Sequence, residues 1–196
     1  IEACSDGEAR VRYLTCRLLE QLAPERKSDG GDARVARALE ALFEDGDRDV
    51  RVGASVALAE RGSVAAQQRL IDALNGDIAM QPEDEQAAIG LCAELELHEA
   101  VPGLRRRAWG RWYRSSSPFM FQARVALARL GDERARRDIL DGLSSWSRPV
   151  RTRSAVAAGL AGLQEARARL EAMRSDERQA DSYSVAEALQ IGRAHV

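Results

Sequence analysis

Histidine, cysteine and serine are the residue types through which this sequence could bind a metal or form a covalent intermediate. His98 and Glu99 are adjacent, but a protein-bound metal such as zinc takes at least three protein ligands, and no further ligands accompany this pair. Cys92 is expected on a different helix from His98, and no third group is placed to orient them as a catalytic pair. We therefore predict a protein that is not an enzyme, with no catalytic residue, no metal site and no cofactor.

A second candidate chemistry, the binding of acidic groups, is indicated by the segment LRRRAWGRWYRSSSPFMF at 104–121. Arginine planes and aromatic faces can engage an acidic protein surface or phosphates and stacked bases. A purely structural reading is also open, in which the aromatic side chains fill a gap between helices and the arginines lie in solvent. The candidate binding residues in this segment are Arg105, Arg106, Arg107, Trp109, Arg111, Trp112, Tyr113 and Arg114.

Charge is divided unevenly along the chain. Residues 1–100 hold 11 Lys and Arg against 21 Asp and Glu, whereas residues 101–196 hold 18 against 10. The formal net charge of −2 therefore conceals an acidic first half and a basic second half. This asymmetry favours an acidic partner for the second half of the chain.

The helices that would carry these residues are predicted by a repeated pattern, which is clearest in Asp49–Leu74. Val50, Ala54 and Ala57–Leu58 form one stripe of a helix, and Gly62 ends that helix. Ser63 is expected to cap a second helix whose stripe contains Ala66 and Leu70. Alanine supplies 34 of the 196 residues, which favours closely packed helices.

The pattern recurs at intervals of 31 to 35 residues, which is typical of an α-solenoid with two helices per repeat. Ala66 is followed at this spacing by Ala100, Ala135 and Ala166, and Gly62 by two further glycines. We predict an all-α fold, an α-solenoid of about five helix pairs over residues 1–190. The expected pairs are 8–22 with 32–45, 48–61 with 64–75, 83–95 with 98–112, 118–130 with 133–144 and 148–161 with 164–175, and 181–190 begins a partial sixth repeat.

The segments DVRVGASVALAERG, FQARVALARLGDERA and PVRTRSAVAAGLAGLQEA resemble bacterial HEAT-like repeats of the phycobilisome-lyase type. Two departures from the family pattern are Glu96, which stands where the turn glycine is expected, and Phe119–Met120, which replace Val-Arg. The resemblance implies that Asp49, Arg51 and the matching Arg12 and Arg151 make structural bonds between repeats. It also implies that the second helix of each pair lines a concave face.

On that face the aligned second helices would add Arg136, Arg137, Arg167 and Arg169 to the candidate binding residues, as one basic stripe. We therefore predict a non-catalytic scaffold that binds an unknown protein partner with an acidic surface. One alternative is a nucleic-acid-binding solenoid similar to the HEAT-like DNA glycosylases. A protein similar to the bilin lyases is a third reading.

The remaining expectations concern location and the ends of the chain. Cys4, Cys16 and Cys92 form no CxxC motif and are expected to be reduced thiols. No stretch is long and apolar enough to cross a membrane, and no signal peptide is recognised, so we expect a cytoplasmic protein without a membrane partner. We further expect the chain to be part of a longer array. One back-translation of Ile191–Val196 spells a sequencing adapter, so we expect a non-native tail there.

Overall fold

All secondary structure is helical in the part of the chain that the computed structural model describes, residues 2–22, 30–76, 78–110, 118–176 and 178–194. The chain divides into two compact units, Ile1–Gly103 and Leu104–Val196. The helices are α1 (Ala9–Leu22), α2 (Gly30–Phe43), α3 (Arg48–Glu60), α4 (Val64–Asn75), α5 (Pro82–Glu94), α6 (Val101–Trp109), α7 (Pro118–Arg129), α8 (Glu133–Gly142), α9 (Arg148–Leu160), α10 (Arg167–Arg174) and α11 (Ser182–Ala194).

The all-α prediction is confirmed, and the helices lie close to the expected ranges. Short 3₁₀ turns, η2 (His98–Ala100) and η3 (Gln164–Ala166), precede α6 and α10, and a further turn, η1 (Glu2–Ser5), precedes α1. The last helix, α11, continues through Ala194. A single solenoid across residues 1–190 stays a prediction.

Local capping explains where several helices begin. The Asp47 carboxylate accepts hydrogen bonds from the backbone N–H groups of Asp49 and Val50 at the start of α3. Ser63 caps α4 as predicted, by accepting from Ala66 N–H. Asp132 caps α8 in the same way, through Ala135 N–H at 2.9 Å. Each cap satisfies a backbone donor that the first helical turn leaves without a partner.

Glycines end the first helices, as the repeat predicts. Gly62, Gly131 and Gly162 have φ values of 90°, 82° and 67°, a left-handed conformation that glycine adopts without steric cost. At the corresponding turn after α5, Glu96 has a φ of 54°. Glu96, which stands where the repeat pattern has glycine, therefore adopts the left-handed conformation although it carries a side chain.

Replacing Glu96 with Gly is expected to raise the free energy of unfolding by about 0.5–1 kcal/mol. The left-handed conformation costs about 1–2 kcal/mol, and the added freedom of glycine in the unfolded chain offsets part of that gain. Urea denaturation of the two proteins measures the difference. The matched control is Glu94→Gly, which removes the same charge from the last turn of α5 and is expected to destabilise by up to about 1 kcal/mol. A loss of stability in Glu96→Gly would contradict the strain argument.

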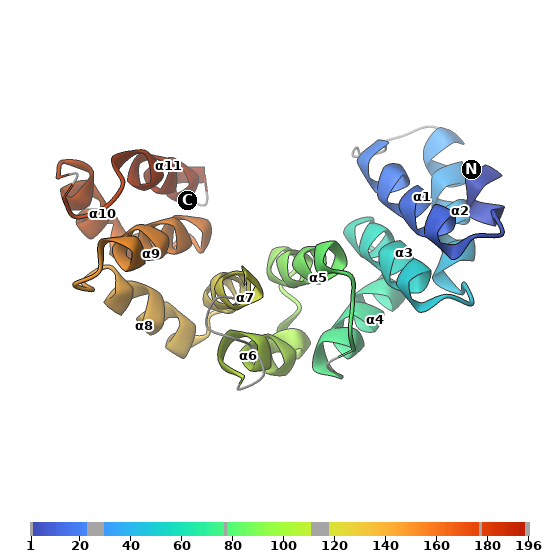
Figure 1. The fold of residues 1–196 in the computed structure, drawn as a ribbon, viewed down its shortest axis with the longest axis horizontal. Coiled ribbons are helices and arrows are strands. Elements are labelled where there is room, and N and C mark those ends of the chain that lie inside the picture. Colours follow the sequence, from blue (N-terminus) through green and yellow to red (C-terminus); the bar gives the residue numbers. More distant parts are fainter. Residues whose placement is uncertain (1, 23–29, 77, 111–117, 177, 195–196) are drawn as a thin grey trace. The chain divides into compact units, whose positions relative to one another are not determined.

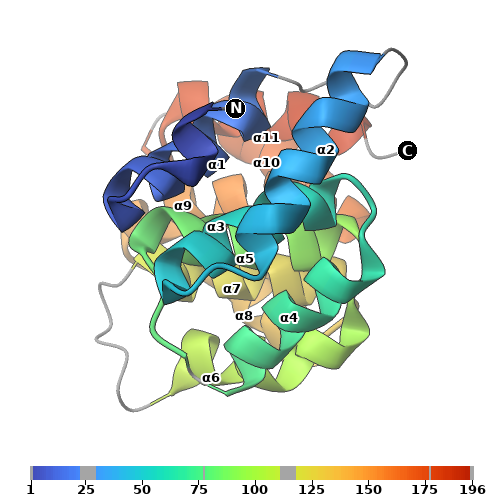
Figure 2. The ribbon, with the colours of Figure 1, turned by 90° about the vertical axis from the view of Figure 1, so that its right-hand side faces the viewer.

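The core of the first unit is built around α3. In Figures 1 and 2, α1, α3 and α5 follow one another in one layer, and α2 and α4 form a second layer. The predicted stripe of Val50, Ala54 and Ala57–Leu58 is buried. Val52 and Val56 are buried as well, because α3 packs against α1, α2, α4 and α5 and so has neighbours on every side.

The second unit repeats this packing around α9, which contacts α7, α8 and α11. The closest approach lies between α9 and α11, where a Cβ atom added to Gly159 would lie 2.6 Å from the Ala188 backbone. In both units the first helices of successive pairs stack on one another (α1, α3 and α5; α9 and α11).

Candidate interaction surface

The predicted binding residues occupy three second helices. Arg105, Arg106, Arg107 and Trp109 lie on α6, Arg136 and Arg137 on α8, and Arg167 and Arg169 on α10. Arg111, Trp112, Tyr113 and Arg114 lie outside the described residues. The structure adds Arg134 of α8, which the alignment of second helices did not select.

An open groove of about 390 Å³ brings α6 and α8 together in the second unit. It is lined by Arg105, Arg106, Trp109, Gly110 and Arg134, and we call it the Arg–Trp groove. The Arg134 guanidinium carbon lies 4.1 Å from the centre of the Trp109 ring, within the range of a cation–π interaction. The groove therefore presents cationic groups beside an aromatic face.

Two aspartates of α8 orient the groove residues. The Trp109 indole N–H donates to the Asp138 carboxylate at 2.9 Å, and Arg105 contacts the Asp132 carboxylate at 2.7 Å. Burial acts to raise the pKa of the Asp132 carboxyl, but hydrogen bonds from Ala135 N–H and Arg105 outweigh it and hold that pKa below its usual value. Asp132 thus caps α8 and at the same time binds the Arg105 side chain of α6.

Arg107 does not belong to this surface, which corrects its place among the candidate binding residues. Its side chain is 1% exposed. Leu104 and Ala108 are also buried and lie three residues before and one residue after Arg107, so position 107 is on the core-facing stripe of α6. An interior arginine is not available to a partner.

Ion pairs also interrupt the predicted basic stripe. Arg136 contacts Glu165 of η3 at 2.6 Å, and Arg167 contacts Glu171 at 3.3 Å. The Arg136 hydrogen bond lowers the pKa of the Glu165 carboxyl, as expected for a carboxylate beside a guanidinium. Arg137 and Arg169 are exposed on α8 and α10. The second helices therefore carry separate cationic positions rather than a continuous column.

The matching arginines of the first helices make local bonds to the backbone, and Arg151 also bonds the following repeat through the Gln179 and Arg178 carbonyls. Arg12, Arg51 and Arg151 each donate from Nη1 to the two backbone carbonyls five and six residues earlier, at distances of 2.6–3.3 Å. Arg12 also makes a two-pronged contact with Asp45, the last residue of the first expected pair, at 2.7 and 2.9 Å. Asp49 accepts from Gln81 of the following repeat at 2.6 Å. We call the Nη1 arrangement the arginine clamp.

The residues considered for metal binding and catalysis differ in exposure. His98 and Glu99 are exposed, whereas Cys16 and Cys92 are fully buried. Burial raises the pKa of the Cys16 thiol to about 12, so this group stays protonated at neutral pH. Within the described ranges, no group of three or more His, Cys, Asp or Glu is placed to hold a metal ion.

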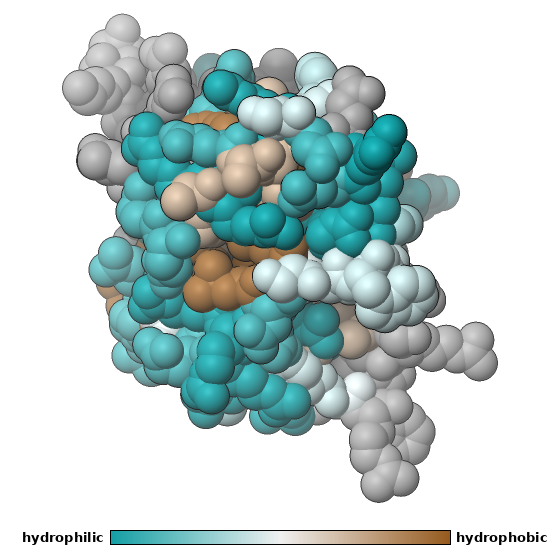
Figure 3. Space-filling model, turned by 90° about the vertical axis from the view of Figure 1, so that its left-hand side faces the viewer, coloured by the Kyte–Doolittle hydropathy of each residue, from teal (hydrophilic) through white to brown (hydrophobic). Residues whose placement is uncertain are grey.

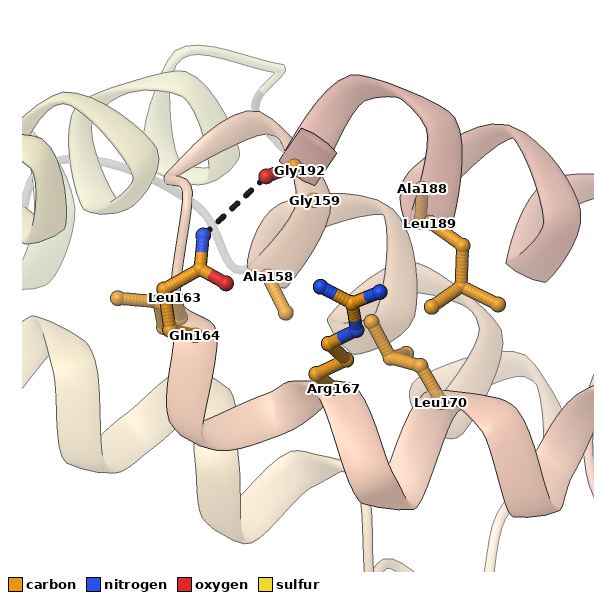
Figure 4. Close-up of a pocket in the computed structure, with 9 residues that line it drawn as sticks. All are labelled: Ala158, Gly159, Leu163, Gln164, Arg167, Leu170, Ala188, Leu189 and Gly192. Carbon is orange, nitrogen blue, oxygen red and sulfur yellow. Dashed lines mark hydrogen bonds between the residues drawn. The ribbon is translucent and has the colours of Figure 1, made fainter. Parts of the chain in front are cut away.

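A cavity between α9, α10 and α11 is too small for a ligand. Figure 4 shows Leu163, Leu170 and Leu189 around it, with Gln164 donating to the Gly192 carbonyl at 3.2 Å. Its volume of about 20 Å³ is enough for one water molecule.

Figure 3 shows the surface at the α10 and α11 end of the second unit, where a few hydrophobic side chains lie among hydrophilic ones.

Comparison with protein-family models and with curated proteins found no match to this chain. Among the described helices, none combines the length and apolar character that a membrane span requires. The functional interpretation therefore depends on the chemistry of the residues themselves. The Arg–Trp groove is the described surface that concentrates the predicted binding residues.

Proposed function

We propose that the chain is a non-catalytic scaffold of HEAT-like helix pairs, stacked as an α-solenoid, that binds a protein partner with an acidic surface. The observation that carries the proposal is the Arg–Trp groove, in which three arginines surround one indole. Arginine and tryptophan are the residue types most enriched at energetically dominant positions of protein interfaces. The recurrence of helix pairs along the chain supports the scaffold role, because stacked repeats present extended binding surfaces.

The electrostatics of the groove favour a carboxylate ligand over a nucleic-acid backbone. Asp132 contacts Arg105 and Asp138 accepts from the Trp109 indole, so two carboxylates offset part of the positive charge of the groove. A duplex carries one negative charge for about every 1.7 Å of its axis. A groove with built-in aspartates would repel part of that charge, whereas a carboxylate on a protein can pair with Arg134, the guanidinium stacked on the indole.

Nucleic-acid binding is the second candidate, because an exposed arginine stacked on an indole can also engage a phosphate and a base. It predicts a steep linear loss of log affinity with log salt concentration, with a slope of about −0.9 for each phosphate neutralised. The bilin-lyase reading has no residue in the described chain to support it beyond the repeat resemblance itself.

Replacing Arg134 with Glu is expected to weaken binding of a fluorescent Glu-rich peptide by about tenfold, because it removes one cation of the groove and adds a repelling charge. Fluorescence anisotropy at several salt concentrations measures the change. Arg137→Glu is the matched control, since this exposed residue of α8 lies outside the groove and carries the same change of charge.

Three results would decide against the acidic-protein proposal. The first is equal weakening by the two variants, which would mean that only net charge matters. The second is tighter binding of a random-sequence DNA duplex with the steep salt dependence described above. The third is a lower melting temperature for Arg134→Glu with unchanged peptide binding, which would make the cation–π contact purely structural.

A further inference from the structure

The arginine clamp occurs in three repeats. In one of them, the residue whose carbonyl lies five positions before the arginine is not glycine. The carbonyls five residues before Arg12 and Arg51 belong to Gly7 and Gly46, and the one before Arg151 belongs to Trp146. A Cβ atom added to either glycine would have no atom within 4 Å. The loop therefore forms without a side chain at this position, and the fold does not require the indole of Trp146.

Trp146 is 95% exposed, so it also contributes no core packing. Single apolar residues at a surface are common and need no explanation on their own. Trp146 differs because its loop is held rigidly: Arg151 donates to the carbonyls of Ser145 and Trp146 at 2.7 and 2.9 Å. A side chain on a fixed loop loses less freedom on binding than one on a mobile loop.

The same guanidinium also holds a second backbone segment beside the loop of Trp146. Arg151 also donates to the carbonyls of Gln179 and Arg178, at 2.5 and 3.1 Å, which places residues 178–179 beside the loop of Trp146. The side chains of Arg148 and Arg178 are exposed at this edge of the second unit. Arg148 follows Trp146 by two residues and donates to the Ala180 carbonyl at 3.5 Å, and the backbone of Arg178 lies beside the same loop, so two exposed arginines belong to this edge.

The neighbouring aspartates are engaged in local hydrogen bonds. Asp176 accepts from Arg178 N–H and from the Gln179 side chain at 3.0 and 3.1 Å. Asp181 accepts from the backbone and hydroxyl groups of Ser184 at 2.8 and 2.7 Å. These hydrogen bonds, with a smaller contribution from the charges of Arg178 and Arg148 respectively, hold the pKa of the Asp176 and Asp181 carboxyls below the usual value. Both carboxylates therefore accept hydrogen bonds from donors of this chain.

We propose that Trp146 anchors a protein partner by entering an apolar pocket whose rim carries carboxylates that pair with Arg148 and Arg178. Tryptophan gives the large buried area typical of an interface anchor, and the two exposed arginines of this edge select an acidic rim. This site follows the end of α8, whereas the Arg–Trp groove lies at the start of that helix. The two sites are tested by different variants, and the anchor goes beyond the proposed function.

The test is a selection of displayed random peptides on the full chain, with removal of peptides that also bind Trp146→Ala. The selected peptides are expected to combine an apolar residue with Asp or Glu, and their affinity should fall by at least about tenfold in Trp146→Ala and in Arg148→Glu/Arg178→Glu. Arg134→Glu, in the Arg–Trp groove, should leave this binding unchanged. The melting temperature of Trp146→Ala should equal that of the parent.

Gly46→Trp supplies the matched control for the loop itself. It places an indole at the same clamp position in the first unit, where the space is open, and should also leave the melting temperature unchanged. Without Arg148 and Arg178 beside it, this indole should not restore peptide binding when combined with Trp146→Ala.

Several outcomes would overturn the anchor. A selection that yields no Trp146-dependent peptide, or a Trp146→Ala variant that melts at a lower temperature, would remove the site. Selected peptides without carboxylates would overturn the acidic rim. Trp146-dependent binding of oligothymidine or of vesicles containing phosphatidylserine, in place of peptides, would assign the exposed indole to nucleic acid or to a lipid surface.

Discussion

Replacing Leu70 with Asp is expected to unfold the first unit, Ile1–Gly103. The Leu70 side chain is 0% exposed on α4, which packs against α3. The substitution forfeits about 2–3 kcal/mol of apolar burial and places an unpaired carboxylate in the core at a cost of several kcal/mol more. Since domains have net stabilities of only about 5–15 kcal/mol, the loss is comparable with the whole free energy of unfolding. Far-ultraviolet circular dichroism and urea denaturation measure it.

Val64→Asp is the matched control for this prediction. Val64 is the first residue of the same helix and is 76% exposed, so the same new charge stays in water. A carboxylate in the first turn also interacts favourably with the helix dipole, by a few tenths of a kcal/mol. Val64→Asp should therefore match or exceed the parent in stability. A Leu70→Asp protein that melts with the parent would show that the repeat register is wrong.

Replacing Gly159 with Ala is expected to lower the free energy of unfolding by about 1–3 kcal/mol, the usual cost of forcing an extra carbon into a packed interior. The new Cβ would lie 2.6 Å from both Cα and the carbonyl oxygen of Ala188, and 2.8 Å from its Cβ. These atoms belong to α11, so the helix must move away from α9. Thermal and urea denaturation of the intact chain report the loss.

Gly90→Ala is the control with the opposite expected sign. Gly90 lies inside α5, and a Cβ there would meet no atom within 4 Å. Alanine favours a helix interior over glycine by about 0.5–1 kcal/mol, so this variant should be more stable than the parent. If both variants changed stability in the same direction, helix propensity rather than close packing would govern position 159.

Several features could be predicted from the sequence because they depend on neighbours along the chain. A stripe at the helical period predicted the buried face of α3 through Val50, Ala54 and Leu58, and Ser63 was recognised as a cap. Gly62 was predicted to end its helix, and it does so in the left-handed conformation that glycine adopts freely. The structural role of the clamp arginines came from the family resemblance.

The same reasoning applied to α6 would have placed Arg107 correctly. Leu104, Arg107 and Ala108 share a helical stripe, but the charge of the arginine led us to expect it at the surface. Trp146 was missed for a similar reason. Its position in the repeat corresponds to Gly46, and this mismatch was visible in the sequence. Only the clamp geometry shows that this position needs no side chain, and that the indole there is exposed.

The sequence by itself determined the helices, their caps and their turns, because propensity, capping and left-handed glycine are decided within a few residues. The tertiary structure decided the character of the candidate sites. The arginine-rich segment contains no acidic residue, yet α8 brings Asp132 to Arg105 and Asp138 to Trp109, and it places Arg134 over the indole. Electrostatic and hydrogen-bond energies depend on distance in space, so the charge of that surface was fixed when the two helices packed together.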